Sequence, residues 1–302
     1  MQAGIYSNIS DLLGFKFPVK RKKLAHQQTL ISAKGGYHQA VRKGRGMSFT
    51  EVREYQPGDE IRHIDWKVTA RTQKTHTKVF TEELEKPIIC MTEQTPNLFF
   101  GSQERFKIVQ ALNISAIIGW LALNNGDKFG GQVFNNQQGI WNKPQQNHKS
   151  LLQFFQHALT LQSAIKSPID SLNTSWTSQL EQVKKQINSG NRIFLIGDFL
   201  NQPVSFFQQL SHFRKRNQIT LVHIFDALEK NLPKAGMLNF SNGFSKFRLD
   251  SNLVARQKDY QTAYEISWQA LKSECGKLHI PVIEIDCAQN PVIELINQEV
   301  IR

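Results

Sequence analysis

The sequence predicts an α/β fold in which a mostly parallel sheet is flanked by helices. Short apolar runs rich in Ile and Val recur from about residue 87, and longer stretches separate them. Such runs are typical of strands buried on both faces of a parallel sheet. Parallel neighbours need connections of a dozen or more residues, and the separating stretches are long enough to supply them. The predicted strands are 87–91, 128–134, 192–196, 220–225 and 281–285.

The stretches between these runs predict helices. Residues 102–123 form the first crossover, and its apolar second half predicts a buried helix. Residues 150–164 carry apolar side chains at helical spacing, Pro203 suits the first position of another helix, and Asn252 can cap a long one. We interpret the aromatic stripes on these helices as core. Residues 237–249 break the alternation and predict a β-hairpin insertion around an Asn-Gly turn.

Residues 1–86 differ from the rest and predict a basic N-terminal segment. They lack helical periodicity beyond a weak start at Ile9, and they carry several Gly-containing turn signals. Strands are expected at 47–55 and 77–80. The segment is too small and polar for an independent core, so we expect it to pack on the α/β domain formed by 87–302.

Length and composition exclude several classes of protein. With 302 residues, of which 40% are hydrophobic and 21% charged, the chain has a globular balance. Its three cysteines form no C-x-x-C motif, which argues against a disulfide scaffold and a structural zinc site. The longest apolar stretch, 116–123, is much shorter than the roughly 20 residues of a membrane-spanning helix. We therefore expect a cytoplasmic protein without a transmembrane segment or a secretion signal.

Positive charge is concentrated near the N-terminus. The formal net charge is +12, and residues 1–80 hold 15 Lys and Arg against 6 Asp and Glu. The densest clusters are 20–23 and 42–45. Such a field attracts an acidic protein, an anionic membrane surface or nucleic acid, and a solvated basic arm without a special partner is the simplest alternative. Nucleic acid is the least favoured partner, because no helix-turn-helix, zinc-finger or RNA-binding signature accompanies the charge.

Residues 46–71 carry a long and specific motif. They read GMSFTEVREYQPGDEIRHIDWKVTAR, and 77–83 continue the pattern. This stretch resembles the signature of the bacterial "domain of unknown function 58" family, which runs roughly G-x-E/S-F-x-x-x-R-x-Y-x-x-G-D-x-x-R-x-I-D-W-x-x-T-A-R. A second stretch, 226–236, resembles the D-P-x-E…L-P…G pattern of the same family. The resemblance spans about 35–240.

The resemblance implies a von Willebrand factor A-like, Rossmann-like α/β domain. It also implies a non-enzymatic interaction factor, which works with a MoxR-type AAA+ ATPase and other von Willebrand A-like proteins in the assembly or maturation of protein complexes. Because the N-terminal segment is basic, a peripheral contact with the inner membrane or a membrane complex is a further expectation. Two alternatives stay open: a nucleic-acid-binding module that uses the basic segment, and a metal-dependent hydrolase.

The family signature interleaves acidic and basic residues around Trp66. Arginine forms planar bidentate pairs with carboxylates, so we interpret these charges as a mutual ion-pair network that pins the segment onto the α/β domain. A partner-docking surface is the alternative, and the two are compatible. The predicted structural or interaction residues are Arg53, Tyr55, Gly58, Asp59, Arg62, Asp65, Trp66 and Arg71.

The resemblance also raises the question of a metal site. Many von Willebrand A-like domains bind a divalent cation through D-x-S-x-S after the first strand and an Asp after a later strand, and such hard oxygens suit Mg²⁺. The corresponding residues here are Glu93, Thr95, Asn97 and Asp198. Glu93 is longer than Asp, and Asn97 offers a carbonyl oxygen instead of a hydroxyl, so this adhesion-type site is degenerate. We expect no resident cofactor and at most weak Mg²⁺ binding.

No enzyme motif accompanies this site. The sequence has no G-x-S-x-G elbow, Walker lysine motif, H-E-x-x-H or G-x-G-x-x-G. The spacings of His26, His38, His63 and His76 match no metal-binding pattern, so we expect them to be ordinary surface or half-buried histidines. The sequence therefore predicts no catalytic residue.

Overall fold

The structure is a computed structural model that describes residues 4–25, 47–82, 87–165, 175–241 and 246–302. Its contacts divide the chain into two compact units. The α/β unit comprises Met1–His26 and Lys86–Arg302, and the signature unit comprises Gln27–Glu85. Each unit is described by itself, and the packing of one on the other stays a prediction.

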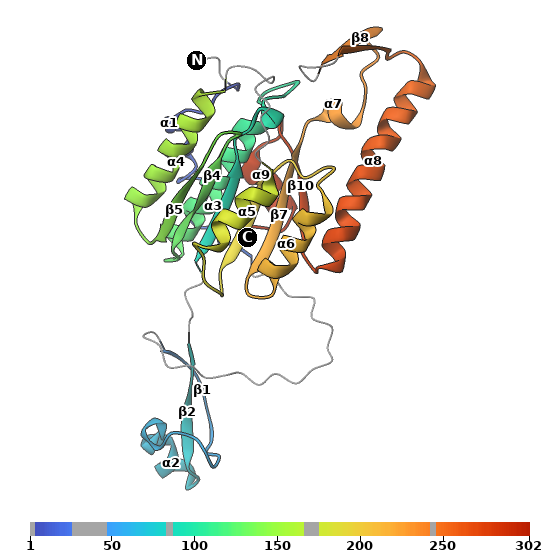
Figure 1. Cartoon of the computed structure of the whole chain (residues 1–302). Helices are drawn as coiled ribbons and strands as arrows, with labels where there is room; N and C mark the ends of the chain where they lie inside the picture. The colour runs from blue at the N-terminus through green and yellow to red at the C-terminus, as the bar shows by residue number, and fades with distance from the viewer. Residues whose placement is uncertain (1–3, 26–46, 83–86, 166–174, 242–245) are drawn as a thin grey trace. The chain divides into compact units, whose positions relative to one another are not determined.

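The α/β unit is built on a six-stranded sheet with the order β10-β7-β6-β3-β4-β5. All neighbouring strands are parallel except β5, which runs antiparallel to β4 at one edge. Figure 1 shows the strands side by side with helices around them. The strands are β3 (Ile88–Glu93), β4 (Phe129–Phe134), β5 (Gly139–Gln145), β6 (Arg192–Gly197), β7 (Gln218–Phe225) and β10 (Val282–Asp286).

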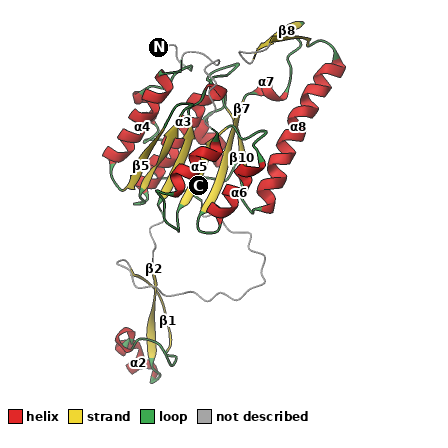
Figure 2. Ribbon diagram, viewed as in Figure 1, coloured by secondary structure: helices red, strands yellow, loops and turns green. Residues whose placement is uncertain are grey.

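Helices cover both faces of this sheet, as Figure 2 shows in red. Alternate residues of each strand point to opposite faces, so β3 buries Ile88 and Cys90 in one apolar cluster and Ile89 and Met91 in another. The first cluster includes α1 (Ile9–Gly14), α3 (Lys107–Asn124), α4 (His148–Ser163) and α9 (Pro291–Asn297). The second includes α5 (Trp176–Lys184), α6 (Val204–Arg214) and α8 (Val254–Lys277). The predicted α/β fold with a mostly parallel sheet is therefore confirmed.

The order in which strands are added to the sheet reverses at its middle, between β3 and β6, and we call this position the reversal point. β3 comes first along the chain, β4 and β5 follow on one side of it, and β6, β7 and β10 follow on the other. In open α/β sheets the crevice beyond the carboxyl ends of the two strands at such a reversal is the usual binding position. Here those strands are β3 and β6, and they end at Glu93 and Gly197.

Each of the five predicted parallel strands is present, with ends that differ by at most two residues. The sequence reasoning missed β5, because this edge strand contains Lys143 and Pro144 and has no apolar run. The predicted pair of antiparallel strands is present as β8 (Met237–Ser241) and β9 (Lys246–Asp250), and the predicted Asn-Gly turn between them lies outside the described residues. The expected cap of the long helix is wrong: Leu253 holds that position, and Asn252 instead accepts a hydrogen bond from the Gly236 amide.

The predicted boundary at residue 86 also needs correction at the N-terminal end. Residues 1–26 group with the α/β unit and not with the signature unit. Leu12 is fully buried, and its carbonyl accepts a hydrogen bond from Trp120 Nε1 at 2.8 Å. Leu24 forms a β-bridge with Ile301 near the C-terminus. Leu12 belongs to α1, which begins at the weak helical start expected at Ile9, whereas no periodic pattern indicated the contact of Leu24.

The signature unit contains a two-stranded antiparallel hairpin. β1 (Met47–Glu54) pairs with β2 (His76–Glu82), close to the two predicted strands. Between them lie the short helix η1 (Ile61–His63) and α2 (Trp66–Thr72). The turn before η1 contains Gly58 with φ +107°, a conformation that glycine adopts without steric cost.

Candidate functional site

The structure brings Glu93, Thr95 and Asp198 together at the reversal point of the sheet. Glu93 ends β3, and Asp198 follows β6 directly. Glu93 Oε2 accepts a hydrogen bond from the backbone amide of Asp198 at 3.0 Å. Asn97 lies in the short helix η2 (Pro96–Leu98) with an exposed side chain. Three of the four predicted metal-site residues are thus neighbours.

The carboxylate of Glu93 is buried and bonded to protein groups. Its Oε1 accepts from Thr95 Oγ1 at 2.5 Å, and its Oε2 accepts from Trp176 Nε1 at 3.0 Å as well as from the Asp198 amide. Burial raises the pKa of Glu93 to about 7, although these hydrogen bonds lower it in part. Glu93 therefore acts as a clamp between the ends of β3 and β6.

Lys107 bridges two carboxylates at the carboxyl edge of the sheet. Lys107, the first residue of α3, has a fully buried side chain. Its Nζ donates to Asp198 Oδ2 and to Glu229 Oε1, each at 2.7 Å. Burial alone would lower the pKa of Lys107, but the charges of Asp198 and Glu229 raise it above its usual value. Its ammonium is therefore a permanent cation at the carboxyl end of the sheet.

The two acids respond differently to Lys107. Burial opposes ionisation of Asp198, but the positive charge of Lys107 outweighs it and lowers the pKa of that carboxyl. Burial is the largest effect on Glu229 and raises its pKa despite the same lysine. The side chains of Asp198 and Glu229 are 24% and 28% exposed, so both carboxylates can be reached from solvent.

Glu229 is held by a capping box in α7 (Ala227–Lys230). Its Oε2 accepts from the backbone amide of Asp226 at 2.9 Å, while the Asp226 side chain accepts from the Leu228 amide. Asp226 also accepts from the amide and the hydroxyl of Ser102, each at 2.7 Å. The loop after β3 and the turn after β7 are therefore fixed to each other around Lys107.

His223 of β7 lies behind Asp198 and is fully buried. Its Nδ1 accepts from the backbone amide of Phe199 at 3.3 Å and lies 3.6 Å from Asp198 Oδ1. The ring stacks on Trp268 with a centroid distance of 5.5 Å. Burial lowers the pKa of His223 to about 4, so the ring is neutral at pH 7.

These residues do not fit a divalent metal ion. Glu93 already accepts three hydrogen bonds, and the ammonium of Lys107 occupies Asp198 Oδ2 and would repel a second cation. In the ranges that the structure describes, no group of three or more His, Cys, Asp or Glu side chains is placed to hold a metal. The contacts of Lys107 and Glu93 join the loops of this edge, and we derive no metal-dependent step from them.

The signature residues form separate pairs. Arg53 donates to Asp59 Oδ1 at 2.7 Å, and Asp59 also accepts from the amide of Gln56. Arg62 is instead paired with Glu60 at 3.2 Å. The predicted mutual cluster is therefore wrong for Arg62, because its side chain points to the neighbouring acid and is 73% exposed.

Asp65 has a different role from the one predicted for it. Its Oδ1 accepts from the amides of Lys67 and Val68, so it is the N-cap of α2, and Lys78 lies 3.5 Å from its other oxygen. Trp66 is 67% exposed and is not the centre of an ion-pair network. Arg71 is exposed and has no ion pair within the described part of the chain. Tyr55 is half-buried, and its amide donates to Thr75.

The two predicted basic clusters differ in what the structure describes. Residues 20–23 form a turn in the α/β unit, and Lys20, Arg21 and Lys23 are exposed. Lys23 is anchored through backbone hydrogen bonds to Arg302. Residues 42–45 lie outside the described residues. Of the four histidines singled out in the sequence, His63 and His76 are partly exposed, and His26 and His38 also lie outside the described residues.

The sequence reasoning missed Lys107, Glu229 and His223 as site residues. A lysine at the start of an otherwise apolar helix was the available signal, because burial of a lysine requires a carboxylate partner. Glu229 belonged to the second family-like stretch, but its partner lies 122 positions away in the sequence. His223 gave no signal, because it sits in an apolar strand run where a satisfied core histidine is common.

Comparison with known proteins shows a family and distant relatives. The family described as "Protein of unknown function DUF58" matches residues 51–267. "Uncharacterized protein Rv1480" of Mycobacterium tuberculosis (strain ATCC 25618 / H37Rv) and "Uncharacterized protein Mb1516" of Mycobacterium bovis (strain ATCC BAA-935 / AF2122/97) are each 24% identical over 216 residues. The matches cover 71% of this chain and 66% of each relative, so the chain spans slightly less than two thirds of the relatives' length.

Two solved structures are also similar. BatB from Bacteroides thetaiotaomicron, a conserved hypothetical protein, gives a TM-score of 0.44 at 14% identity, covering 71% of this chain and 97% of that chain. Proximal thread matrix protein 1 from the mussel byssus gives a TM-score of 0.33 at 12% identity, covering 47% of this chain and 38% of that one.

One helix of the described residues is long and apolar enough to cross a membrane. This helix is α3, and 89% of it is buried inside the structure. It includes 116–123, the longest apolar stretch of the sequence. Its position between the sheet and the neighbouring helices is that of a core helix.

Proposed function

The chain belongs to the DUF58 family, and from this premise we propose that it is a non-enzymatic protein-interaction factor that docks its partner at the carboxyl edge of the sheet. The observation that carries this proposal is the buried ammonium of Lys107, bound by Asp198 and Glu229. A fixed cation beside two partly exposed carboxylates needs no metal to complete the site.

We further propose that the α/β unit is von Willebrand A-like. The order of its strands and the position of Glu93 and Asp198 at the reversal point support this assignment. In such domains a metal ion joins the loops beyond the strands and receives the partner. In this chain Lys107 joins the same loops, because its ammonium contacts the residue after β6 and the turn after β7.

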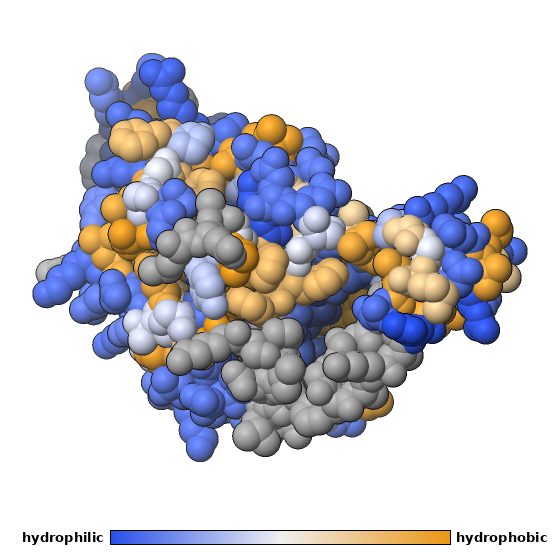
Figure 3. Space-filling view, turned by 90° about the horizontal axis from the view of Figure 1, so that it is seen from above, coloured by the Kyte–Doolittle hydropathy of each residue, from blue (hydrophilic) through white to orange (hydrophobic). Residues whose placement is uncertain are grey.

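Exposed apolar side chains flank the lysine site and support docking of a protein. Phe100, in the loop after β3, is 41% exposed, and Val204, at the start of α6, is 73% exposed. Figure 3 looks down on the end of the α/β unit that carries these loops, and apolar residues lie among polar ones there. An apolar centre with a polar rim is typical of protein interfaces.

The proposed partner is a MoxR-type AAA+ ATPase together with other von Willebrand A-like proteins, and the proposed role is the assembly or maturation of protein complexes. The family resemblance supports this choice. The exposed basic turn at 20–23 offers a second, electrostatic contact with an acidic partner or a membrane surface. The hydrolase alternative loses support, because Lys107 and three protein donors already engage the carboxylates that would hold its metal.

Affinity capture from the native host, followed by mass spectrometry, tests the proposal. The bait is the full chain, and the docking variant is Val204→Asp, which places a charge at the exposed start of α6. The matched control is Ile266→Asp, because Ile266 is 65% exposed and belongs to α8, outside the loops that follow β3 and β6. Both variants add the same charge to an exposed helix position.

We expect the wild type and Ile266→Asp to capture the ATPase, and Val204→Asp to lose it. Capture of the ATPase by all three proteins in equal amounts would show that the partner docks at another surface of the protein. Capture of no protein partner, with nucleic acid retained through 20–23, would instead support the nucleic-acid alternative.

A further inference from the structure

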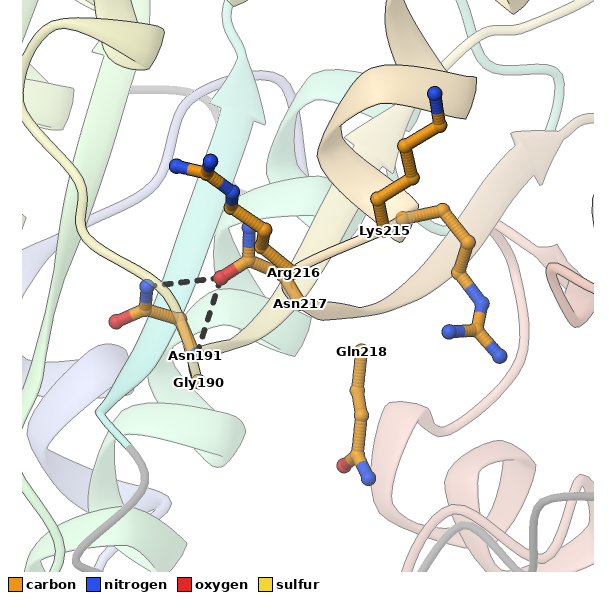
Figure 4. A pocket seen from close by; sticks show the side chains of 7 residues that line it. Gly190, Asn191, Lys215, Arg216, Asn217 and Gln218 are labelled. Carbon is orange, nitrogen blue, oxygen red and sulfur yellow. Dashed lines mark hydrogen bonds between the residues drawn. The ribbon is translucent and has the colours of Figure 1, made fainter.

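A small basic hollow lies at the opposite end of the sheet from the lysine site. It has a volume of about 250 Å³ and is formed where α6 turns into β7 and where the chain enters β6. Figure 4 shows its lining, with Lys215 and Arg216 leaving the same short turn. The lining residues are Gly190, Asn191, Arg214, Lys215, Arg216, Asn217 and Gln218.

The frame of this hollow is held by two buried amide side chains. Asn217 Oδ1 accepts from the backbone amide and from the side-chain Nδ2 of Asn191, at 3.1 and 2.9 Å. These are the two dashed lines of Figure 4. Asn217 Nδ2 donates to the carbonyl of Phe213, and the Gly190 amide donates to the carbonyl of Arg216. The two loops are therefore fixed to each other before any ligand arrives.

The cations around the hollow lack acidic partners. Arg214, Lys215 and Arg216 are consecutive, and none of them forms an ion pair with an acid of the described residues. Lys215 and Arg216 are exposed, and the only side-chain bond of Arg214 there is a long one of 3.4 Å to the carbonyl of His279. Figure 4 shows the free ends of Lys215 and Arg216 pointing to different sides of the turn. Adjacent like charges repel one another, and an anion bound close to them relieves that repulsion.

The helix dipole accounts for part of this cluster only. Basic residues at the last turn of a helix are favoured, which covers Arg214 at the end of α6 and Lys215 at its C-cap. Arg216 lies beyond the helix. The end of α5 offers a direct comparison, because Lys184 and Lys185 occupy the same positions of that helix and do not line the hollow.

The size and chemistry of the hollow select its ligand. Sites for drug-sized ligands and cofactors have roughly 300–1,000 Å³, so this hollow is suited to a single small group. Three positive charges match a phosphoryl dianion better than a single carboxylate, and guanidinium groups bind phosphate oxygens in bidentate fashion. We propose that this hollow binds a phosphoryl group, with Arg214, Lys215 and Arg216 as its cationic ligands. The proposal is independent of the docking function at the other edge.

Titration of inorganic phosphate into the ¹⁵N-labelled full chain, followed by NMR, tests this site. Chloride at the same ionic strength is the control for charge screening. The test variant is the double substitution Lys215→Gln and Arg216→Gln, and the control variant is Lys184→Gln and Lys185→Gln. All four positions are exposed, and each pair removes two adjacent charges at or directly after the end of one helix.

We expect phosphate, and not chloride, to shift the amide signals of Gly190 and Gln218 in the wild type. The affinity should fall about tenfold or more in the test variant and remain unchanged in the control variant, because only the former removes charged ligands. Absence of phosphate binding, or an equal loss in both variants, would overturn the proposal.

Vesicles distinguish the source of the phosphoryl group. Flotation with phosphatidylglycerol vesicles, compared with phosphatidylcholine vesicles, is measured for the same two variants. Loss of flotation in the test variant alone identifies a lipid headgroup as the ligand. Phosphate binding without a variant-dependent change in flotation identifies free phosphate or a soluble phosphorylated ligand. Both of these results support the site.

Discussion

Lys107 Nζ lies 2.7 Å from Asp198 Oδ2, although the two residues are 91 positions apart in the sequence. Lys107 begins α3, and Asp198 follows β6, so the contact joins a crossover helix to the strand on the far side of the reversal point. A second contact of the same length joins Lys107 to Glu229. The lysine therefore connects segments that the backbone of the sheet alone leaves separate.

Substitution of Lys107 tests how strongly this contact stabilises the fold. Lys107→Met keeps the length of the side chain but leaves Asp198 and Glu229 without their counter-charge. We expect the free energy of unfolding to fall by about 3–5 kcal/mol, the usual cost of breaking a buried pair. Urea unfolding measures it. Lys277→Met, which removes an exposed pair with Glu274, should cost only about 0–1 kcal/mol. Equal losses in both variants would contradict a structural role for Lys107.

Glu93 should make the protein less stable as the pH rises. Its pKa is about 7 in the folded protein and 4.5 as the ordinary value, so the folded state binds its proton more tightly. Its contribution is complete below about pH 4.5 and is lost as the pH rises towards 7, by roughly 3 kcal/mol in total. Urea unfolding measured from pH 4.5 to 8 should show this decline in the free energy of unfolding for the wild type and not for Glu93→Gln. The control Glu265→Gln, at an exposed position, should retain the decline. A decline of wild-type size in Glu93→Gln would assign it to another group.

His223 should have the opposite effect. Its pKa falls from 6.5 to about 4 in the folded protein, so the unfolded state binds a proton first as the pH falls. Its contribution is complete above pH 6.5 and is lost between pH 6.5 and 4. His223→Gln should therefore lose less stability than the wild type over this range, as urea unfolding at each pH will show. His212→Gln, at an exposed site on α6, serves as the control and should follow the wild type.

The cap of α2 gives a local prediction for the signature unit. Asp65→Ala removes two hydrogen bonds to the amides of Lys67 and Val68 and should cost about 0.5–2 kcal/mol. Hydrogen exchange of the peptide that contains 66–72 should accelerate accordingly. Asp65→Asn retains a capping oxygen and should preserve most of the protection. Equally fast exchange in both variants would show that the charge of Asp65, and not its cap, protects the helix.

The sheet could be predicted from the sequence, because its parallel strands are buried on both faces and are therefore apolar. Runs such as 192–196 are short and almost continuously apolar, whereas the longer apolar stretch 116–123 belongs to the buried helix α3. The edge strand β5 was not predictable in this way, because it is partly exposed and includes Pro144. Helix ends were accurate only to a few residues, since the competing cap at Asn252 makes a tertiary hydrogen bond instead.

The site was predictable only in part, for a similar reason. Glu93, Thr95 and Asp198 follow strands, and the carboxyl ends of neighbouring parallel strands meet at one edge. The placement of Lys107 depends on how α3 returns to that edge, and local sequence does not encode this. The signature unit shows the same limit, because its charges suggested one network while the turns between β1 and β2 direct Arg53, Arg62 and Asp65 to different partners.

The central claim is that Lys107, and not a metal ion, supplies the cation at the carboxyl edge of the sheet. Calorimetric titration of Mg²⁺ and Mn²⁺ into the wild type and Asp198→Ala tests it most directly. Our account predicts no binding tighter than about 1 mM, the weak end of the range for oxygen sites, in either protein. A micromolar dissociation constant in the wild type that disappears in Asp198→Ala would contradict it.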